Sequence, residues 1–132
     1  MTDIPHLLSS SHTIAVVGLS DRPERDSYKV ARYLKSRGYQ IFPVNPNIKT
    51  VLGETAYSRL EDIPGPVDIV DIFRVSTEVP AIVDSAIRIG AKAVWMQFGV
   101  ISEAGAKRAM DAGLEVVMDR CMMLEHRKLG LP

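Results

Sequence analysis

The chain is poor in the residues that form disulfide and zinc scaffolds. Cys121 is its one cysteine, and no CxxC pair or cluster of cysteine and histidine occurs among its 132 residues. A lone cysteine excludes an intramolecular disulfide, and the missing cluster argues against a structural metal site. We therefore expect a protein of the reducing cytoplasm that holds no metal.

The sequence also lacks an excess of charge of either sign and any long apolar run. Lys plus Arg and Asp plus Glu both number 16, so the formal net charge is zero. A neutral chain creates no global field that would attract nucleic acid or an anionic membrane. We expect no secretory leader and no membrane-spanning segment, since no apolar stretch has the necessary length. Local clusters of positive charge can still bind a small anion.

What the chain does contain is a regular alternation of buried strands and amphipathic helices. Continuous apolar runs predict strands at residues 13–17, 39–44, 67–73, 92–98 and 114–118. Helical spacing predicts helices at residues 4–8, 24–37, 76–90, 102–112 and 122–128, with Ser76 or Thr77 as the cap of the third. Residues 48–65 are expected to form a looser connection, with an extended piece at 54–57 and one turn at 59–62.

This alternation predicts an α/β fold, a three-layer doubly wound (Rossmann-like) sheet of five parallel strands. We expect one domain over residues 1–132, of which residues 1–11 are an N-terminal helical extension. In such a fold the ligand lies outside the carboxyl ends of the strands, at the point where the strand order reverses. The loops at the strand ends are therefore where a site should be sought.

The first of these loops carries phosphate-binding chemistry. The first predicted strand stops at Gly18, and Ser20, Arg22, Arg25 and Ser27 follow before the next helix begins. Glycine lets the backbone approach a ligand, while hydroxyls, guanidinium groups and the free amides of a helix N-terminus bind phosphate oxygens. The alternative is that the two arginines are solvated loop charges and that Ser27 is a plain helix cap.

Two signatures of NAD-binding enzymes are missing. The first turn has no GxGxxG, because Leu19, Ser20 and Asp21 follow Gly18. The second strand ends in Asn45-Pro46, where an acidic residue would bind the adenosine ribose. NAD is therefore disfavoured, although another nucleotide is not.

The third and fourth strands end in further candidate ligand contacts. Phe73 and Arg74 follow the third strand, and the planar fork of an arginine can bridge two phosphoryl oxygens. The alternative is an ion pair of Arg74 with Asp71 or Glu78. After the fourth strand, Gln97 and Gly99 offer a side-chain amide and a flexible backbone, although the same residues are typical of a simple strand-exit turn.

These strand ends lie in six segments that together resemble the small stand-alone CoA-binding proteins, whose domain is similar to the CoA-binding domain of the succinyl-CoA synthetase alpha subunit. The segments are Ile14-Ala-Val-Val-Gly18, Ser27-Tyr28-Lys29-Val30, Pro43-Val-Asn-Pro46, Val67-Asp-Ile-Val-Asp-Ile-Phe-Arg74, Ala93-Val-Trp-Met-Gln97 and Val117-Met-Asp-Arg-Cys121 with Glu125-His126. Each is unspecific alone, but the six occur in this order over nearly the whole chain.

The resemblance implies coenzyme A or an acyl-CoA as the cofactor. Gly18, Ser20 and Arg25 would contact its phosphates, and Arg74 its diphosphate. Asn45 and Pro46 would flank the adenine and ribose, with Gln97 and Gly99 along the pantetheine arm. Arg22, Ser27, Tyr28 and Phe73 complete the expected binding residues. The synthetase domain has a second glycine in its first loop, where this chain has Asp21 and an insertion from Arg22 to Arg25.

The sequence favours a non-catalytic or regulatory binding module. No Ser-His-Asp or paired-carboxylate arrangement is present, so we predict no catalytic residues. Two alternatives remain open: the CoA-binding subunit of an acyl-CoA synthetase-type complex, and an enzyme acting on a nucleotide-linked substrate through Cys121 or His126. Cys121 could contact the coenzyme thiol, whereas His126 lies about 140° further around the helix and should not face it. A homodimer and a synthetase-type partner subunit are both compatible with the sequence.

Overall fold

The predicted strands lie side by side in one parallel sheet. The computed structural model describes residues 2–130, and its five-stranded sheet has the order β2-β1-β5-β6-β7. The strands are β1 (Thr13–Val17), β2 (Gln40–Val44), β5 (Ile69–Ile72), β6 (Ala93–Met96) and β7 (Glu115–Val117). Val17 pairs in register with Val44 on one side and with Ile72 on the other, so the carboxyl ends of β2, β1 and β5 are level.

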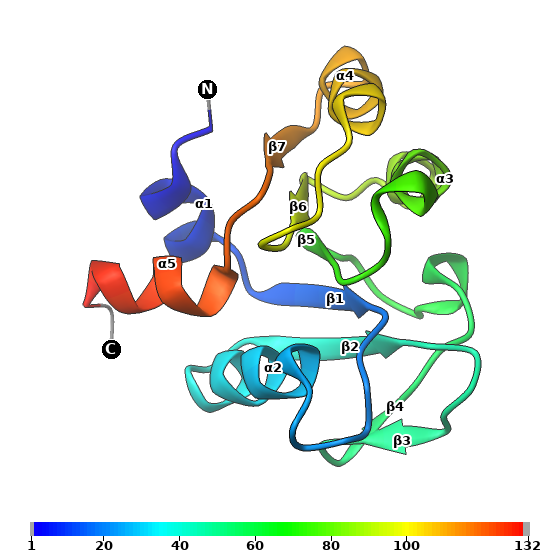
Figure 1. Cartoon of the computed structure of the whole chain (residues 1–132), viewed down its shortest axis with the longest axis vertical. Coiled ribbons are helices and arrows are strands. Elements are labelled where there is room, and N and C mark those ends of the chain that lie inside the picture. Colours follow the sequence, from blue (N-terminus) through cyan, green and yellow to red (C-terminus); the bar gives the residue numbers. More distant parts are fainter. Residues whose placement is uncertain (1, 131–132) are drawn as a thin grey trace.

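Helices cover both faces of this sheet (Figure 1). One face is covered by α1 (Ile4–Ser10), α2 (Asp26–Ser36) and α5 (Met122–Leu129), and the other by α3 (Val79–Arg88) and α4 (Glu103–Asp111). This is the predicted three-layer α/β fold. Within residues 2–130, no helix combines the length and the apolar character that crossing a bilayer would require.

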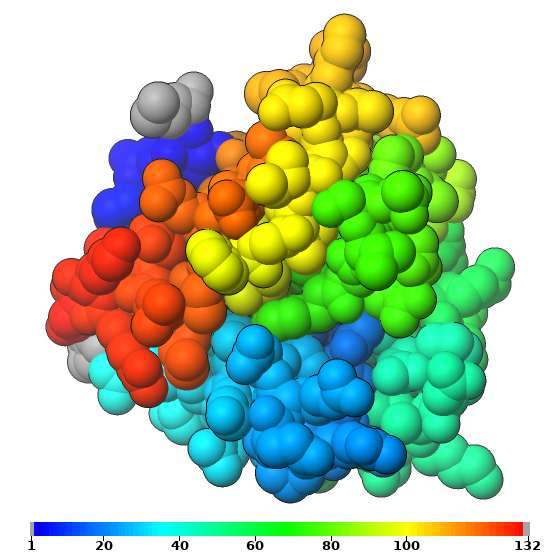
Figure 2. Space-filling view, in the orientation of Figure 1, coloured from blue at the N-terminus to red at the C-terminus, as the bar shows by residue number. Residues whose placement is uncertain are grey.

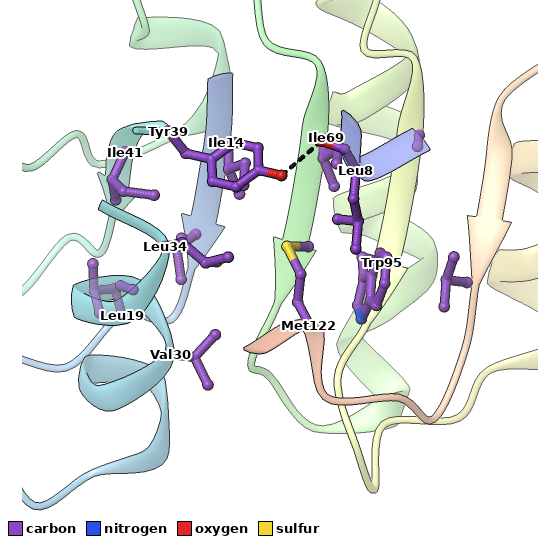
Figure 3. Close-up of a cluster of buried hydrophobic side chains, with 14 of the residues drawn as sticks. Leu8, Ile14, Leu19, Val30, Leu34, Tyr39, Ile41, Ile69, Trp95 and Met122 are labelled. Atoms are coloured by element: carbon purple, nitrogen blue, oxygen red, sulfur yellow. Dashed lines mark hydrogen bonds between the residues drawn. The ribbon is translucent and has the colours of Figure 1, made fainter. Parts of the chain in front are cut away.

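Alternate residues of each strand enter two separate cores. Ile14 and Val16 pack towards α1, α2 and α5, whereas Ala15 and Val17 pack towards α3 and α4. The first core contains Trp95 and Met122, both fully buried (Figure 3). The indole of Trp95 also has a hydrogen-bond partner, since its Nε1–H donates to the Arg120 carbonyl at 2.8 Å. A continuously apolar strand is the expected consequence of burial on both faces.

The loose connection between β2 and β5 is more regular than the sequence indicated. The extended piece expected at 54–57 is one half of a short antiparallel hairpin, β3 (Thr50–Val51) with β4 (Glu54–Thr55). The expected turn is a 3-10 helix, Leu60–Asp62. The first half of the hairpin was missed because two residues are too few to show a strand period.

The predicted cap of α3 is wrong. A 3-10 turn, Ser76–Glu78, precedes the helix, and the capping position is Glu78, which makes no side-chain capping bond. The Ser76 hydroxyl instead accepts the backbone N–H of Ile101 at 3.0 Å. A partner 25 positions away thus replaces the local capping bond.

The sheet has one point where the direction of winding reverses. After β1 the chain passes through α2 to β2 on one side, and after β5 it passes through α3 to β6 on the other. The loops that leave β1 and β5 therefore diverge to opposite faces and leave a crevice between their ends.

Candidate functional site

A cavity of about 540 Å³ lies at this crevice, beside the carboxyl ends of β1 and β5. Its lining consists of Gly18, Ser20, Arg22, Arg25, Asp26, Ser27 and Phe73. In Figure 2 the first loop (blue) meets the segments that follow β5 (green) and β6 (yellow) on one face of the molecule. Six predicted binding residues thus surround one cavity, and Asp26 is the lining residue that the sequence did not single out.

Gly18 is required by the geometry of the first turn. Its φ is +87°, and a Cβ built on it would lie 2.6 Å from the carbonyl oxygen of Phe73. The backbones of the two loops therefore meet at this residue, with no room for a side chain. The close approach brings Phe73 to the edge of the cavity.

Hydrogen bonds fold the first loop over the start of α2. The Ser20 N–H donates to Ser27 Oγ at 3.0 Å, and the Arg22 N–H donates to Ser20 Oγ at 3.1 Å. Ser27 lies inside the first turn of α2 and is buried, while Arg25 occupies the capping position. The alternative in which Ser27 is a plain cap is therefore wrong, because its hydroxyl holds the loop instead.

The cavity carries a local excess of positive charge. Arg22 and Arg25 both line it, and neither forms an ion pair with any residue of the described range 2–130. Asp26 contributes the opposing charge and stands in the first turn of α2, where the helix dipole stabilises an acid. Two unpaired guanidinium groups beside a helix N-terminus are suited to an anion with more than one negative charge.

Arg74 lies at the margin of this cavity with its guanidinium group engaged elsewhere. Its Cδ is 2.9 Å from the position of a Cβ on Gly18, so its stem covers the first turn. Its Nη2 lies 2.9 Å from Glu78 Oε2, and its Nε lies 3.3 Å from Glu78 Oε1. Of the two ion pairs considered from the sequence, the structure contains the one with Glu78. Contact with a diphosphate stays a prediction.

Asp71, the other suggested partner, is buried in the sheet. It is fully inaccessible to solvent, and neither carboxylate oxygen has a hydrogen-bond partner among the described residues. Burial raises the pKa of Asp71 well above its ordinary value, and the neighbouring Ile72 amide offsets this only in part. Asp71 therefore favours its neutral form in the folded protein.

The end of β2 closes one side of the first loop. Asn45 Nδ2 donates to the Leu19 carbonyl at 3.0 Å, and Asn45 Oδ1 accepts the Asn47 N–H at 2.9 Å. Pro46 beside it is exposed. Tyr28 packs partly against the core, with the Arg32 guanidinium 6.0 Å from its ring centre. None of these residues lines the cavity.

The end of β6 is tied to the segment that follows β7. Gln97 is buried, and its Oε1 accepts the N–H of Met122, the first residue of α5, at 3.0 Å. The Gly99 N–H donates to Asp119 Oδ1 at 2.7 Å. Asp119 has a φ of +60°, and its role was missed although it lies within one of the six segments that carry the resemblance. Both predicted pantetheine contacts thus already have protein partners.

Cys121 and His126 are directed to different surroundings. Cys121 is partly exposed at the capping position of α5. His126 is 2% exposed, and its Nδ1 lies 2.7 Å from the Tyr33 hydroxyl. Burial, with a smaller effect of Arg37, lowers the pKa of His126. The described residues contain no group of three or more His, Cys, Asp or Glu side chains placed to hold a metal ion.

This chain matches one family model and several known proteins. The model of the CoA binding domain matches residues 12–127. The Bacillus subtilis protein YneT is 40% identical over 94% of this chain and 92% of its own length. A solved structure of a hypothetical protein from Pyrococcus horikoshii has a TM-score of 0.95 and 41% identity, over 98% of this chain and 92% of that one. An ADP-forming acetate–CoA ligase of Archaeoglobus fulgidus is 30% identical over 74% of this chain but only 15% of its own length.

Proposed function

The chain belongs to the CoA binding domain family, and we propose that it binds coenzyme A or an acyl-CoA at the carboxyl edge of its sheet, as a non-catalytic or regulatory module. The observation that carries this proposal is the cavity between the first loop and the end of β5, with its two unpaired arginines. The diphosphate would lie there, near Gly18 and the first turn of α2. A volume of about 540 Å³ is adequate for this part of the ligand.

The rest of the ligand would follow the strand ends in both directions. The adenine and ribose would lie near Asn45 and Pro46, on the β2 side of the cavity. The pantetheine arm would cross the ends of β5 and β6, past Gln97 and Gly99. Neighbouring strands are about 4.8 Å apart, and the side chain of Gln97, at the end of β6, is hydrogen-bonded to the first residue of α5, so an extended arm that crosses these two strand ends reaches α5. Cys121 stands there, and the coenzyme thiol would end close to it.

Titration calorimetry with four ligands tests this proposal. We expect coenzyme A to bind, dephospho-CoA to bind more weakly, and NAD and AMP to bind least. NAD shares the adenosine diphosphate but lacks the pantetheine arm, and AMP lacks the diphosphate as well. Equal affinity for all four ligands, or no binding of any, contradicts the proposal.

Arg74→Ala is expected to weaken the binding of coenzyme A roughly ten- to hundred-fold, because a charge-assisted contact contributes about 1.5–3 kcal/mol. The pair with Glu78 is half exposed on both sides, so it contributes about 1 kcal/mol at most and a diphosphate can displace it. Glu78→Gln should therefore leave the affinity equal or raise it a few-fold.

Arg59→Ala is the matched control for this measurement. Arg59 also forms an exposed ion pair, with Asp62 at 3.4 Å, but it belongs to the connection between β2 and β5. We expect its replacement to leave the affinity unchanged. Unchanged affinity in Arg74→Ala as well would place the diphosphate elsewhere.

The match to the acetate–CoA ligase supports a second candidate function. This chain corresponds to 15% of that protein's length, so it could supply a CoA domain to a separately encoded partner. Recovery of an ATP-grasp-type protein in a pull-down would favour this function. The enzyme alternative gains no comparable support, because His126 is buried against Tyr33 rather than directed to Cys121.

A further inference from the structure

Three large apolar side chains are exposed at the strand ends beside the proposed pantetheine path. Val75 follows β5 and is 63% exposed, while Phe98 and Ile101 follow β6 and are 78% and 48% exposed. Together they account for three of the five exposed large apolar side chains in the described residues. We refer to Val75, Phe98 and Ile101 as the apolar rim.

Hydrogen bonds hold the two loops of the apolar rim in place. The Ile101 N–H donates to the Ser76 hydroxyl at 3.0 Å, which joins the loop after β6 to the loop after β5. The Val100 N–H donates to the Gln97 carbonyl at 2.8 Å and closes a tight turn around Phe98. Because these bonds already order the backbone around Phe98, a ligand that covers this turn does not have to order the loop.

We propose that the apolar rim receives the acyl chain of an acyl-CoA thioester, and that this chain is longer than acetyl. The inference rests on the proposed function, since it requires the diphosphate in the cavity and the pantetheine arm across the ends of β5 and β6. An arm on that path brings the thioester beside the loop after β6. A hydrocarbon chain attached there would lie against Phe98, with Val75 and Ile101 as its neighbours.

The size of the apolar rim favours a ligand over a second protein copy. An aromatic side chain exposes roughly 150–250 Å² when free, so one partly covered aromatic and two partly covered, smaller aliphatic residues offer at most a few hundred Å² in total. A stable protein–protein interface buries about 800 Å² on each partner. The rim supplies only a small part of the apolar area of such an interface, whereas its size matches an acyl chain of about eight carbons.

Calorimetry with coenzyme A, acetyl-CoA and octanoyl-CoA tests the inference. Each methylene removed from water can raise affinity by as much as about fourfold, so we expect octanoyl-CoA to bind wild type at least tenfold tighter than coenzyme A. Acetyl-CoA should differ little from coenzyme A. The double variant Phe98→Ser with Ile101→Ser should lose the octanoyl gain and retain its affinity for coenzyme A.

Met110→Ser is the matched control, because Met110 is 58% exposed but lies near the C-terminal end of α4, away from the strand ends. It should keep the full octanoyl gain. Thermal unfolding of all variants checks that the fold is preserved, as expected for exposed positions.

The outcomes separate this inference from the proposed function. If wild type binds coenzyme A but binds octanoyl-CoA no tighter, the inference is overturned and the proposed function stands. An octanoyl gain that survives in the double variant also overturns it, because the chain then lies elsewhere. Absence of coenzyme A binding overturns both.

Discussion

Replacement of Gly18 by alanine is expected to lower the free energy of unfolding by about 3–4 kcal/mol, in the range of severe core substitutions. Two effects combine at this position. A φ of +87° is strained for any residue with a side chain, and the new Cβ would lie 2.6 Å from the Phe73 carbonyl oxygen. The second effect forces the ends of β1 and β5 apart.

Gly38→Ala separates these two effects. Gly38 has a similar φ of +97°, but nothing lies within 4 Å of the position of its Cβ. Its replacement should therefore cost only about 1–2 kcal/mol, the cost of the left-handed backbone alone. Urea unfolding of both variants measures the difference. Equal losses would mean that the contact between the two loops is not tight in solution.

Gly18→Ala should also impair the site. The Gly18 N–H donates to the Val44 carbonyl at 2.9 Å, and the Phe73 N–H donates to the Val17 carbonyl at 2.9 Å, so these bonds join all three strands at the cavity. A shift at Gly18 moves both Phe73 and the first loop. We expect Gly18→Ala to bind coenzyme A at least tenfold more weakly, whereas Gly38→Ala binds it normally.

Asp71→Asn is expected to stabilise the protein at neutral pH, by about 1.4 kcal/mol for each unit by which burial raises the pKa of the Asp71 carboxyl in the folded state. Asp71 lies in register between Val16 and Trp95 in the middle of the sheet, and it is fully buried. A charge at this place has no counter-ion among the described residues. The amide of asparagine has nearly the shape of the neutral acid and carries no charge.

The pH dependence identifies the cause of this stabilisation. Because the pKa of Asp71 in the folded protein is above the unfolded value, the wild type loses stability as pH rises from about 3.8 towards the folded pKa. Below that window both states hold the proton and the penalty of the charge is absent. The advantage of Asp71→Asn over wild type should therefore be small near pH 4 and should grow as the pH increases.

Urea unfolding at several pH values measures this difference. Asp111→Asn is the control, since Asp111 is exposed and pairs only with Lys107 one helical turn away. It should change stability by less than about 0.5 kcal/mol. A difference between Asp71→Asn and wild type that does not vary with pH would show that the Asp71 carboxyl ionises as readily in the folded state as in the unfolded state, and hence that burial does not raise its pKa.

The cavity was largely predictable from the sequence, whereas the pantetheine contacts were not. Four of the cavity's lining residues stand within eight positions of one another: Gly18, Ser20, Arg22 and Arg25. A glycine that follows a buried strand indicates a turn, so these residues could be assigned to one loop. The role of Gln97 could not be predicted in this way, because a polar residue after a strand is equally typical of a ligand contact and of a structural hydrogen bond. The structure places its oxygen on the Met122 amide, which no local pattern predicts.

The order of strands and helices follows from residue types alone, because a strand buried on both faces is apolar whatever covers it, and a helix shows its buried face by its period. Composition likewise disfavoured a disulfide scaffold and a nucleic-acid partner. Local sequence does not determine which of several possible partners a polar side chain binds. Ser76 holds the Ile101 amide, Arg74 holds Glu78, and Asp71 holds no described partner. These outcomes depend on which loops and strands become neighbours in the folded sheet, and hence on distances that the chain acquires only when it folds.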